Sequence, residues 1–331
     1  MTSTKLPAHH APNGRFQNPW PNSGTAGLGR ALRWGLTRNF QRLAPTPMRG
    51  SLPTAASRPE RPRADVGVNT ATWIGHSTVL VQMGGVNVIT DPVFAARASP
   101  FTTLGPRRVM DAGMALDELP PLDVVLLSHN HYDHLDRAST QRLAATTAAT
   151  WVVPLKLGAT LKHWGVQRVV ELDWWERAEV CGLDITATPA RHFSGRSLTD
   201  RFASLWCGYA VASSTARAYF VGDTAYHPEF RQVGERCGPF GFVMMPIGAY
   251  DPRWMMRSVH LDPEEAVRAY VDVSEPHDAK PLMLGIHWGT FRLTDEDMEE
   301  PPQRVRRRWQ ELELDPEHLW IAGFGETRRW A

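Results

Sequence analysis

A run of nine residues, SHNHYDHLD, places three histidines and two aspartates directly after the apolar stretch VVLL. Buried imidazoles and carboxylates without partners are costly, and a bound cation removes that cost because both groups are metal ligands. The spacing H-x-H-x-D-H lets alternate histidines point at one ion, while the residues that follow the turn reach a second. Ligands of these types without thiolates suit zinc, with iron or manganese as alternatives. The run therefore predicts a metal site made by His129, His131, Asp133 and His134.

Three other ligand-type residues each follow a short apolar stretch. His192 comes after ITATPAR, Asp223 after YFVG and His287 after LMLGI. A side chain just beyond a strand lies at the edge of a sheet, where loops carry binding and catalytic residues. Taken singly, each is an ordinary loop residue, but with the first cluster they make seven ligands. Seven ligands suffice for two metal ions that share one carboxylate.

Other hydrolytic and phosphate-binding motifs do not occur in the sequence. No histidine is followed two places later by a lysine, which excludes the H-x-K-x4-D motif of enzymes with a histidine nucleophile. There is also no G-x-S-x-G elbow and no G-x4-G-K-[ST] phosphate loop. Metal-assisted hydrolysis is therefore the reaction that the motifs favour.

The elements that must position these residues are short and numerous. Strands are expected around a Gly84-Gly85 turn, at LDVVLL before the metal run, and at TWVVP, QRVVEL, LDITATPA, GYAVAS, AYFVGD, FGFVMMPIG, KPLMLGIHWG and HLWIAGFG. Helices are expected over 137–147, over a segment that Asp262 caps and Pro263 opens, and at RVRRRWQEL. Strands followed by helices, twice over, predict one α+β domain with two sheets packed face to face and helices outside.

The N-terminal part of the chain differs from the rest in charge. Its first 63 residues carry ten Lys and Arg against one acidic residue, although the net charge of the chain is only +1. We expect a basic arm over 1–65 and a catalytic domain over 66–331. Within the arm, LGRALRWGLTRNFQRL predicts an amphipathic helix over 28–43. That helix either packs on the domain or lies on an anionic membrane surface.

Composition limits the setting of the protein. Hydrophobic residues make up 42% and charged residues 21%, as in globular proteins. The three cysteines are far apart and fit reduced thiols better than disulfides. There is no apolar signal-peptide core and no run of about 18 apolar residues. We expect a cytoplasmic protein, with peripheral attachment to a membrane surface left open.

The metal motifs occur in a familiar order. HNHYDH, the histidine after TPA, VGDT and the late IHWG resemble the motifs of the metallo-β-lactamase superfamily. The sequence is most similar to one branch, the N-acylphosphatidylethanolamine-hydrolysing phospholipase D family. WIGHSTVLV, TDPVFAARASPFTTLGPRR, SHNHYDHLD, VGDTAYHPEF, PIGAYDPRWMM, HLDPEEAV and IHWGTFRLTDE carry that resemblance in order. H-x-H-x-D-H alone would identify only the superfamily.

The resemblance implies a four-layer αβ/βα sandwich, the metallo-β-lactamase fold, with two zinc ions between the sheet edges. The implied ligands of one zinc are His129, His131 and His192, and those of the other are Asp133, His134 and His287, with Asp223 bridging. The implied reaction is attack on phosphorus by a hydroxide that both ions share. Its products are N-acylethanolamine and phosphatidic acid, and Asp133 and Asp223 belong to its catalytic residues.

Four further residues are predicted near the site. Asp91 follows a strand and is expected to orient a ligand histidine through its second ring nitrogen, or else to begin a turn. His76 and Tyr132 are second-shell or substrate candidates, with structural packing as the alternative for each. His260 is the candidate for a substrate phosphate contact and the third predicted catalytic residue. Animal members of the family carry glutamine where Val259 precedes this histidine, so head-group recognition does not carry over directly.

Three functions compete at this stage. The first is a phosphodiesterase acting on N-acyl phospholipids at a membrane, docked through the basic arm. The second keeps the metals but acts on a soluble phosphodiester, a lactone or another ester, because this fold hosts many chemistries. An apolar groove beside the metals would favour the first, and a small polar pocket the second. The third, a nucleic-acid tether with a structural metal, is disfavoured because structural zinc sites are closed and rich in thiolates. No nucleic-acid partner is expected, and the resemblance allows a homodimer.

Overall fold

Two seven-stranded sheets form the centre of the computed structural model, which describes residues 6–21, 29, 33–36 and 45–331. The first sheet contains, in spatial order, β14 (Thr327–Trp330), β1 (Asn69–Gly75), β2 (Thr78–Met83), β3 (Val86–Thr90), β4 (Val124–Leu126), β5 (Thr150–Pro154) and β6 (Arg168–Leu172). The second contains β13 (Leu319–Trp320), β12 (Leu282–Ile286), β11 (Phe242–Pro246), β10 (Arg217–Phe220), β9 (Gly208–Ala212), β8 (Leu183–Thr188) and β7 (Arg177–Val180).

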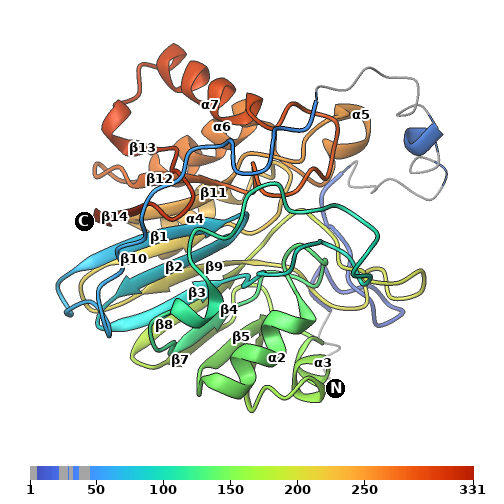
Figure 1. The fold of residues 1–331 in the computed structure, drawn as a ribbon, viewed down its shortest axis with the longest axis horizontal. Coiled ribbons are helices and arrows are strands. Elements are labelled where there is room, and N and C mark those ends of the chain that lie inside the picture. Colours follow the sequence, from blue (N-terminus) through green and yellow to red (C-terminus); the bar gives the residue numbers. More distant parts are fainter. Residues whose placement is uncertain (1–5, 22–28, 30–32, 37–44) are drawn as a thin grey trace.

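Helices cover the outer face of each sheet (Figure 1). The first sheet is covered by α2 (Arg137–Thr146) and α3 (Gly158–His163). The second is covered by α4 (Phe230–Cys237), α6 (Pro263–Ser274) and α7 (Glu300–Glu311), while α5 (Arg253–Met256) precedes α6. Two short 3-10 turns, η1 (Leu116–Glu118) and η2 (Pro316–His318), complete the elements. This arrangement has the four layers, helix, sheet, sheet and helix, that the sequence predicts.

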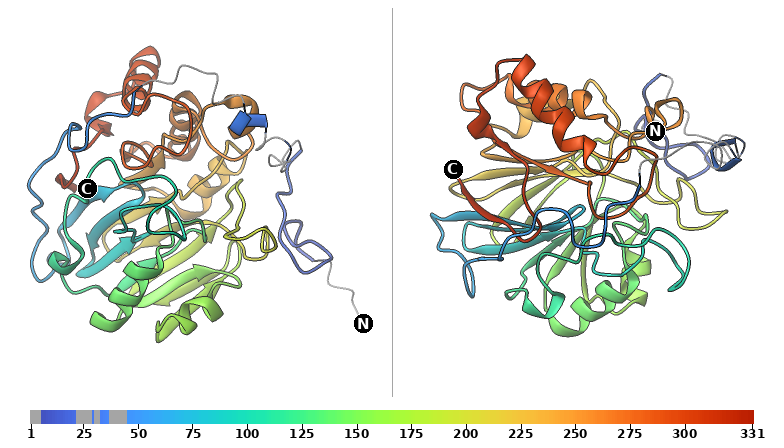
Figure 2. Two further views of the ribbon diagram at one scale, coloured as in Figure 1. Left: turned by 45° about the vertical axis from the view of Figure 1, so that its right-hand side comes forward. Right: turned by 45° about the horizontal axis from the view of Figure 1, so that its top comes forward.

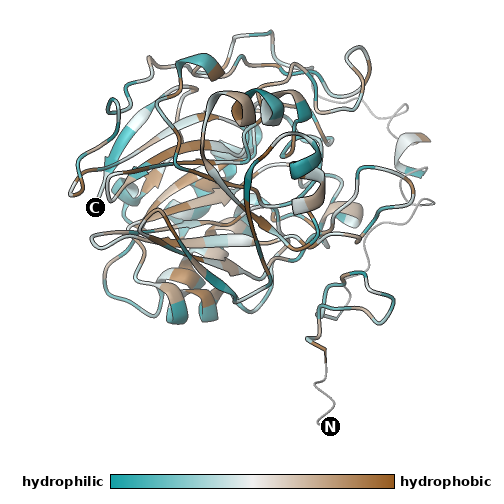
Figure 3. Ribbon diagram, turned by 90° about the horizontal axis from the view of Figure 1, so that it is seen from below, coloured by the Kyte–Doolittle hydropathy of each residue, from teal (hydrophilic) through white to brown (hydrophobic). Residues whose placement is uncertain are grey.

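Alternation along β4 shows how the core is divided. Val124 and Leu126 point into the cluster between the two sheets, whereas Val125 and Leu127 point into the cluster under α2 and α3. Successive residues of a strand face opposite sides, so a strand covered on both faces reads as a continuous apolar run. Each such side chain contributes roughly 1.5–3 kcal/mol on burial. The apolar residues accordingly gather in the central strands (Figure 3).

Parallel pairing brings the predicted site residues to one edge of the sandwich. β3 pairs with β4, β10 with β11 and β11 with β12, all in parallel. The carboxyl ends of parallel strands share an edge, so the loops that follow them lie together. Asp91 follows β3, the run His129–His134 follows β4, and Asp223 and His287 follow β10 and β12. The order of the strands therefore assembles the site.

Most predicted elements occur, with shifts that have local causes. Gly84 and Gly85 form the turn between β2 and β3 with φ of 59° and 77°, values that favour glycine. The last helix begins at Glu300, four residues earlier than predicted, because prolines suit the first turn of a helix. The stretch HLWIAGFG forms only the two-residue strand β13. The edge strand β14, whose TRRW sequence is mostly polar, was not predicted.

The N-terminal residues are described in part. Of the helix predicted over 28–43, residues 29 and 33–36 are described and are helical, and the remainder lies outside the described residues. Residues 6–21 lie against the body of the protein, beside the loop that follows β8 (Figure 2). The boundary between an arm and a domain at residue 65 stays a prediction. In the described part of the chain, no helix is long and apolar enough to cross a membrane.

The capping box of α6 gives a test of the fold. Asp262 accepts a hydrogen bond from the Glu265 backbone N–H at 2.8 Å, and Glu265 reaches back to the Asp262 N–H. We expect Asp262→Ala to lower the free energy of unfolding by about 1 kcal/mol, because the first turn loses its acceptor. Asp262→Asn, which keeps an acceptor oxygen, should lose less, and exposed Asp278→Ala should lose nothing measurable. Urea unfolding measures all three, and equal stability of the Ala and wild-type proteins would contradict this role.

Candidate metal centre

The loop after β4 turns sharply, so that all its ligand-type side chains face one space. The backbone N–H groups of His134 and Leu135 both donate to the carbonyl of His131, at 3.1 and 2.8 Å. That turn brings His134 back beside His129, with ring centroids 4.2 Å apart. Asp136 then caps α2 by accepting hydrogen bonds from the backbone N–H groups of Ala138 and Ser139. The loop is thus held between a strand end and a helix start.

The first group of converging nitrogens belongs to three histidines. His129 Nε2 lies 2.8 Å from His131 Nδ1, and His192 Nε2 lies 3.2 Å from the same atom. His129 and His192 are fully buried. In a tetrahedral zinc site with bonds of about 2.0–2.2 Å, neighbouring ligand atoms lie about 3.3–3.6 Å apart. These three nitrogens therefore have nearly the spacing that one such ion requires.

The second group combines two histidines with a carboxylate. Asp133 Oδ2 lies 3.4 Å from His134 Nε2 and 3.5 Å from His287 Nε2, and the two nitrogens are 3.2 Å apart. Asp223 Oδ2 lies between the groups. It is 3.2 and 3.1 Å from the nitrogens of His134 and His287, and 3.7 Å from His192 Nε2. Asp223 can thus reach both sets of ligands.

These imidazoles and carboxylates would be better satisfied by a bound metal ion than by their contacts with one another. Burial and the neighbouring histidines lower the pKa of His131 to about 3, and burial lowers the pKa of His192 to about 4, so both imidazoles are neutral. Against burial, Asp223 and Asp133 raise the pKa of His287 to about 9. Asp223 Oδ1 is buried without a hydrogen-bond partner. A cation between these groups would satisfy the facing lone pairs and the orphaned oxygen together.

Asp91 fixes one of these histidines from behind. Its Oδ2 accepts from His134 Nδ1 at 2.6 Å and from Ser128 Oγ at 2.6 Å, while Oδ1 accepts from the Ser128 backbone N–H at 2.7 Å. A donor at Nδ1 leaves Nε2 of His134 with its lone pair toward the ligand group. Ser128 Oγ is also 2.9 Å from His129 Nδ1. Asp91 therefore lies where the sequence predicts an orienting carboxylate.

His76 lies behind the second ligand group. Its Nε2 is 3.0 Å from Asp133 Oδ2, and the side chain is almost wholly buried. Burial is the main cause that lowers the pKa of His76 to about 3, so it is a neutral donor to the carboxylate. The centroid of the His76 ring also lies 4.1 Å from that of His287, with the rings tilted by 39°, and the His287 backbone N–H donates to the His76 carbonyl at 3.0 Å. The structure thus brings His76 into the shell that holds the ligands.

His260 and Tyr132 lie on different sides of the ligand groups. The His260 ring is 5.0 Å from that of His192, and its Nδ1 is 3.9 Å from Asp223 Oδ2. It thus faces the space where a substrate would meet the ions. Tyr132 points away: its hydroxyl donates to the Arg196 carbonyl at 3.0 Å, and the Arg196 guanidinium lies 3.9 Å from its ring. Tyr132 lines a neighbouring cavity instead of contacting the ligand residues.

Sequence reasoning missed two residues that hold the metal loop. Arg196 donates to the carbonyls of Asn130 and Leu135, at 2.8 and 2.6 Å. Asn130 Oδ1 in turn accepts from the Gly195 N–H at 2.7 Å. These bonds join the loop after β4 to the loop after β8. Asn130 stands inside the conspicuous run, but its partners are about 65 positions away, so no local pattern indicates the pairing.

Backbone conformation is unusual at three places around the site. His76, Asp91 and His287 have φ of 53°, 32° and 64°, in the left-handed region that side chains other than glycine rarely adopt. Each such residue costs of order 1–3 kcal/mol and persists only where its surroundings determine it. The cluster of three at one sheet edge marks the place where the fold holds side chains against local preference.

The comparisons with known proteins agree with this geometry. A family model described as a beta-lactamase superfamily domain matches residues 86–288, which is more than half of the chain. The chain belongs to this superfamily. The predictions that the chain has the metallo-β-lactamase fold and is a member of this superfamily are thereby confirmed.

Two curated relatives place the chain more narrowly within the beta-lactamase superfamily. It is 41% identical over 248 residues to N-acyl-phosphatidylethanolamine-hydrolyzing phospholipase D 1 of Caenorhabditis elegans, covering 71% of this chain and 68% of the relative. It is 34% identical over 264 residues to the mitochondrial enzyme of the same name from Saccharomyces cerevisiae, covering 77% and 54%. Among solved structures, an isothiocyanate hydrolase from Delia radicum gut bacteria has a TM-score of 0.61 at 19% identity, covering 78% and 98%. The last likeness concerns the fold alone.

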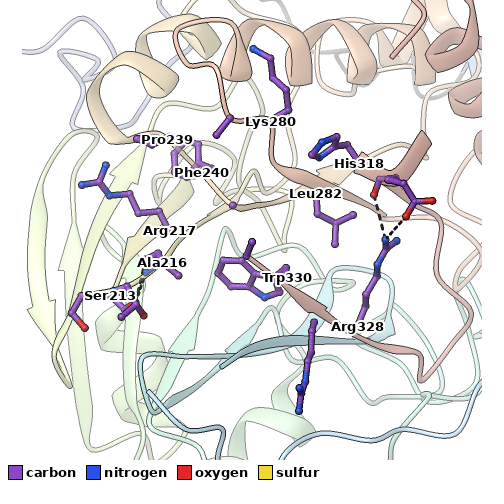
Figure 4. Close-up of a pocket in the computed structure, with 17 residues that line it drawn as sticks. Ser213, Ala216, Arg217, Pro239, Phe240, Lys280, Leu282, His318, Arg328 and Trp330 are labelled. Carbon is purple, nitrogen blue, oxygen red and sulfur yellow. Dashed lines mark hydrogen bonds and ion pairs between the residues drawn. The ribbon is translucent and has the colours of Figure 1, made fainter. Parts of the chain in front are cut away.

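Two cavities lie at different distances from the candidate metal centre. One of about 510 Å³ lies beside the metal loop and is lined by Phe101, Arg137, Tyr132, Trp164 and Arg196, among others. Another, of about 580 Å³, lies at the starts of β10, β11 and β12 (Figure 4). Its lining includes Arg217, Phe240, Lys280, Leu282, Arg328 and Trp330. Asp223 and His287 follow the far ends of β10 and β12. The second cavity is therefore on the opposite edge from the metal centre.

Asp91→Asn tests the orienting carboxylate. An amide cannot accept from both His134 Nδ1 and the Ser128 N–H, so one donor would face another donor. We expect the metal affinity of the protein to fall about 10- to 100-fold, as when other outer partners of ligating histidines are lost. Competition with a chromophoric chelator measures that affinity, with exposed Asp111→Asn as the matched control. Equal affinities in the two variants would show that Asp91 serves packing alone.

Proposed function

We propose that this protein is a dinuclear zinc phosphodiesterase of phospholipase D type. Its substrate would be N-acylphosphatidylethanolamine, and its products N-acylethanolamine and phosphatidic acid. The observation that carries the proposal is the pair of ligand groups that share Asp223 at one sheet edge. The relatives named for this lipid activity supply the substrate class.

The general class of the enzyme is supported by the names of its relatives. Two curated relatives are named phospholipase D and another a metal-dependent hydrolase, and the predicted enzyme class, a metal-dependent hydrolase, is thereby confirmed. The donor set of five imidazoles and two carboxylates without thiolates supports zinc as the metal. The residues that would hold one ion are His129, His131 and His192, and those that would hold the other are Asp133, His134 and His287, with Asp223 between them.

Two zinc ions, when bound, supply a nucleophilic oxygen at neutral pH and neutralise charge on the phosphodiester. Other residues of the chain orient the ligands and face the substrate. Asp91 and His76 hold His134 and Asp133 in place, which keeps the ligand atoms aimed at one space. His260 faces that space from the segment before α6 and is placed to hydrogen-bond a phosphate oxygen. Its backbone is fixed by Arg253, which donates to the His260 carbonyl at 3.0 Å.

The cavity beside the metal loop suits an anionic amphiphile. Arg137 and Arg196 supply positive charge, and Phe101 and Trp164 supply apolar surface. The Arg196 guanidinium lies 5.5 Å from the Trp164 ring, so charge and aromatic surface are adjacent. A lining of this kind supports a phospholipid more than it supports a small neutral ester. It therefore favours the lipid over the soluble substrates that the sequence leaves open.

Exposed apolar side chains on loops and on the short helix α5 support contact with a membrane. Phe101, Leu104, Leu198 and Trp254 are 61%, 65%, 91% and 44% exposed. The Arg33 guanidinium lies 5.2 Å from the Trp254 ring, which joins the basic N-terminal residues to this part of the surface. Exposed apolar tips beside arginines are typical of proteins that bind anionic lipid. The predicted homodimer stays a prediction.

Hydrolysis of N-acylphosphatidylethanolamine dispersed in detergent tests the proposed reaction. We expect the zinc-loaded protein to release N-acylethanolamine, detected by mass spectrometry, and Asp223→Ala to lose that release at least about 1,000-fold because both ions lose a ligand. Exposed Asp278→Ala is the control and should keep full activity.

The other outcomes of this assay separate the alternatives. Two bound metals with no lipid turnover, but with hydrolysis of a lactone or a soluble phosphodiester, would replace the substrate and keep the hydrolase. A folded wild-type protein that binds no metal would overturn the proposal as a whole.

Sedimentation with vesicles tests the contribution of the basic arm to membrane contact. Each basic residue near an anionic leaflet contributes about 1 kcal/mol, so removing four should weaken binding by more than about tenfold. The variant replaces with glutamine Arg30, Arg33, Arg38 and Arg42. The control replaces four exposed cations elsewhere, namely Lys162, Arg168, Arg306 and Arg307. Binding to phosphatidylserine vesicles should fall with added salt in the wild type, and equal loss in the control would remove any special role for the arm.

A further inference from the structure

Residues 6–21, which belong to the basic arm that the sequence predicts over 1–65, close into a loop of their own. His10 forms a bridge with Phe16, and the Gln17 N–H donates to the His9 carbonyl at 2.9 Å. The turn passes through Gly14, whose φ of 75° favours glycine. The segment therefore has a defined shape before its contacts with the rest of the protein are considered.

The first end of this loop is fastened to a carboxylate. His9 Nε2 lies 2.6 Å from Asp173 Oδ1, and His10 Nε2 lies 2.7 Å from Asp173 Oδ2. The His9 ring also stacks 4.3 Å from Trp174. Although burial opposes it, hydrogen bonds from His9 and His10 hold the pKa of Asp173 below its usual range, so the carboxylate is charged when it accepts them. This clasp ties the start of the chain to the segment between β6 and β7.

The middle of the loop packs on the segment that follows His192. Phe16 is 3% exposed, and its N–H donates to the Phe202 carbonyl at 2.9 Å. The Arg15 guanidinium donates to the carbonyls of Thr199, at 2.9 Å, and Arg201. Three backbone positions of this segment thus bond to residues 15 and 16. The N-terminal loop therefore covers the same stretch of chain that carries a predicted metal ligand.

The last part of the loop reaches the ligand itself. Asn18 Nδ2 donates to the carbonyl of His192 at 2.8 Å. The ring of His192 is held separately, by its Nδ1 bonded to the Val259 carbonyl at 2.8 Å. The residue before it is held by Thr224, whose Oγ1 accepts from the Arg191 N–H at 2.8 Å. Asn18 therefore fixes the backbone of a ligand residue whose ring and neighbour are fixed by other elements.

We propose that residues 6–21 act as a brace that positions His192 in the metal centre, with Asn18 as the positioning residue and the His9–Asp173–His10 clasp as its anchor. The inference rests on the proposed metal site. His192 lies between β8 and β9 and outside both strands, although its neighbour Arg191 forms an isolated bridge with Ala225. A shift of that backbone moves Nε2 away from His131 Nδ1, which lies 3.2 Å away. The brace thus acts on the affinity of one ion and leaves the other ligand group untouched.

Metal binding by full-length variants tests this role without any substrate. The metal-free protein is titrated with Zn²⁺ against a chromophoric chelator, which gives two stepwise affinities. We expect Asn18→Ala to weaken one of them about 10-fold, within the range for lost outer partners of ligands, and to leave the other unchanged. Asp173→Asn, which loosens the anchor, should weaken the same affinity. Asn13→Ala is the matched control, because Asn13 lies in the same loop and bonds only the Arg15 N–H among the described contacts.

The melting temperature of the metal-free proteins separates positioning from general stability. Because Asn18→Ala leaves the His192 carbonyl without this donor, the brace predicts a melting temperature only about 2–4 °C below wild type before zinc is added. Unchanged zinc affinities in Asn18→Ala and Asp173→Asn would overturn the brace, and so would equal weakening of both ions together with a larger fall in melting temperature. A wild-type protein that binds no zinc would overturn the brace and the proposed function together. Two tightly bound zinc ions without lipid hydrolysis would remove the substrate and leave this comparison valid.

Discussion

Seven imidazole and carboxylate groups face one another in a buried space between two sheet edges, and the surrounding structure is organised around that crowding. Groups of this kind desolvate at high cost and need charge compensation or exact partners. They come together from four strand ends, three of them on strands with a parallel neighbour (β4, β10 and β12) and one on the antiparallel strand β8. Asp91 and Ser128 then settle which ring nitrogen of His134 and His129 carries a proton, and His76 holds the carboxylate of Asp133. The left-handed backbone at three positions shows that packing overrides local preference to achieve this.

The sequence predicted the site better than the elements around it, for a physical reason. The type of a residue indicates whether it can be a metal ligand, and an apolar run indicates the strand whose end positions it. The seven predicted ligand residues therefore come together as expected, from positions up to 158 apart in the case of His129 and His287, and Asp91 lies behind them. Their roles as ligands stay a proposal until metal is measured. The αβ/βα arrangement followed from the order of strands and helices.

What the sequence did not predict depends on tertiary context. Helices α3 and α4 are only six and eight residues long, too short to stand out from the sequence before packing is known. Strand β14 is an edge strand of largely polar residues that is fixed by pairing with β1. Arg196 and Asn18 bond to backbone carbonyls, which every residue possesses, so no residue type marks their partners. The amphipathic pattern over 28–43 falls mostly outside the described residues.

The order of the ligands along the chain has a consequence for biosynthesis. The histidine-rich loop after β4 leaves the ribosome roughly 150 residues before His287, which at about 5–20 residues per second is on the order of 10–30 s. During that interval β7 to β11 of the second sheet are synthesised, so the group of His129, His131 and His192 is complete first. The group that contains Asp133 and His134 lacks His287 until β12 has been made. The two ligand groups are therefore completed one after the other, and the second needs the two sheets to close on each other.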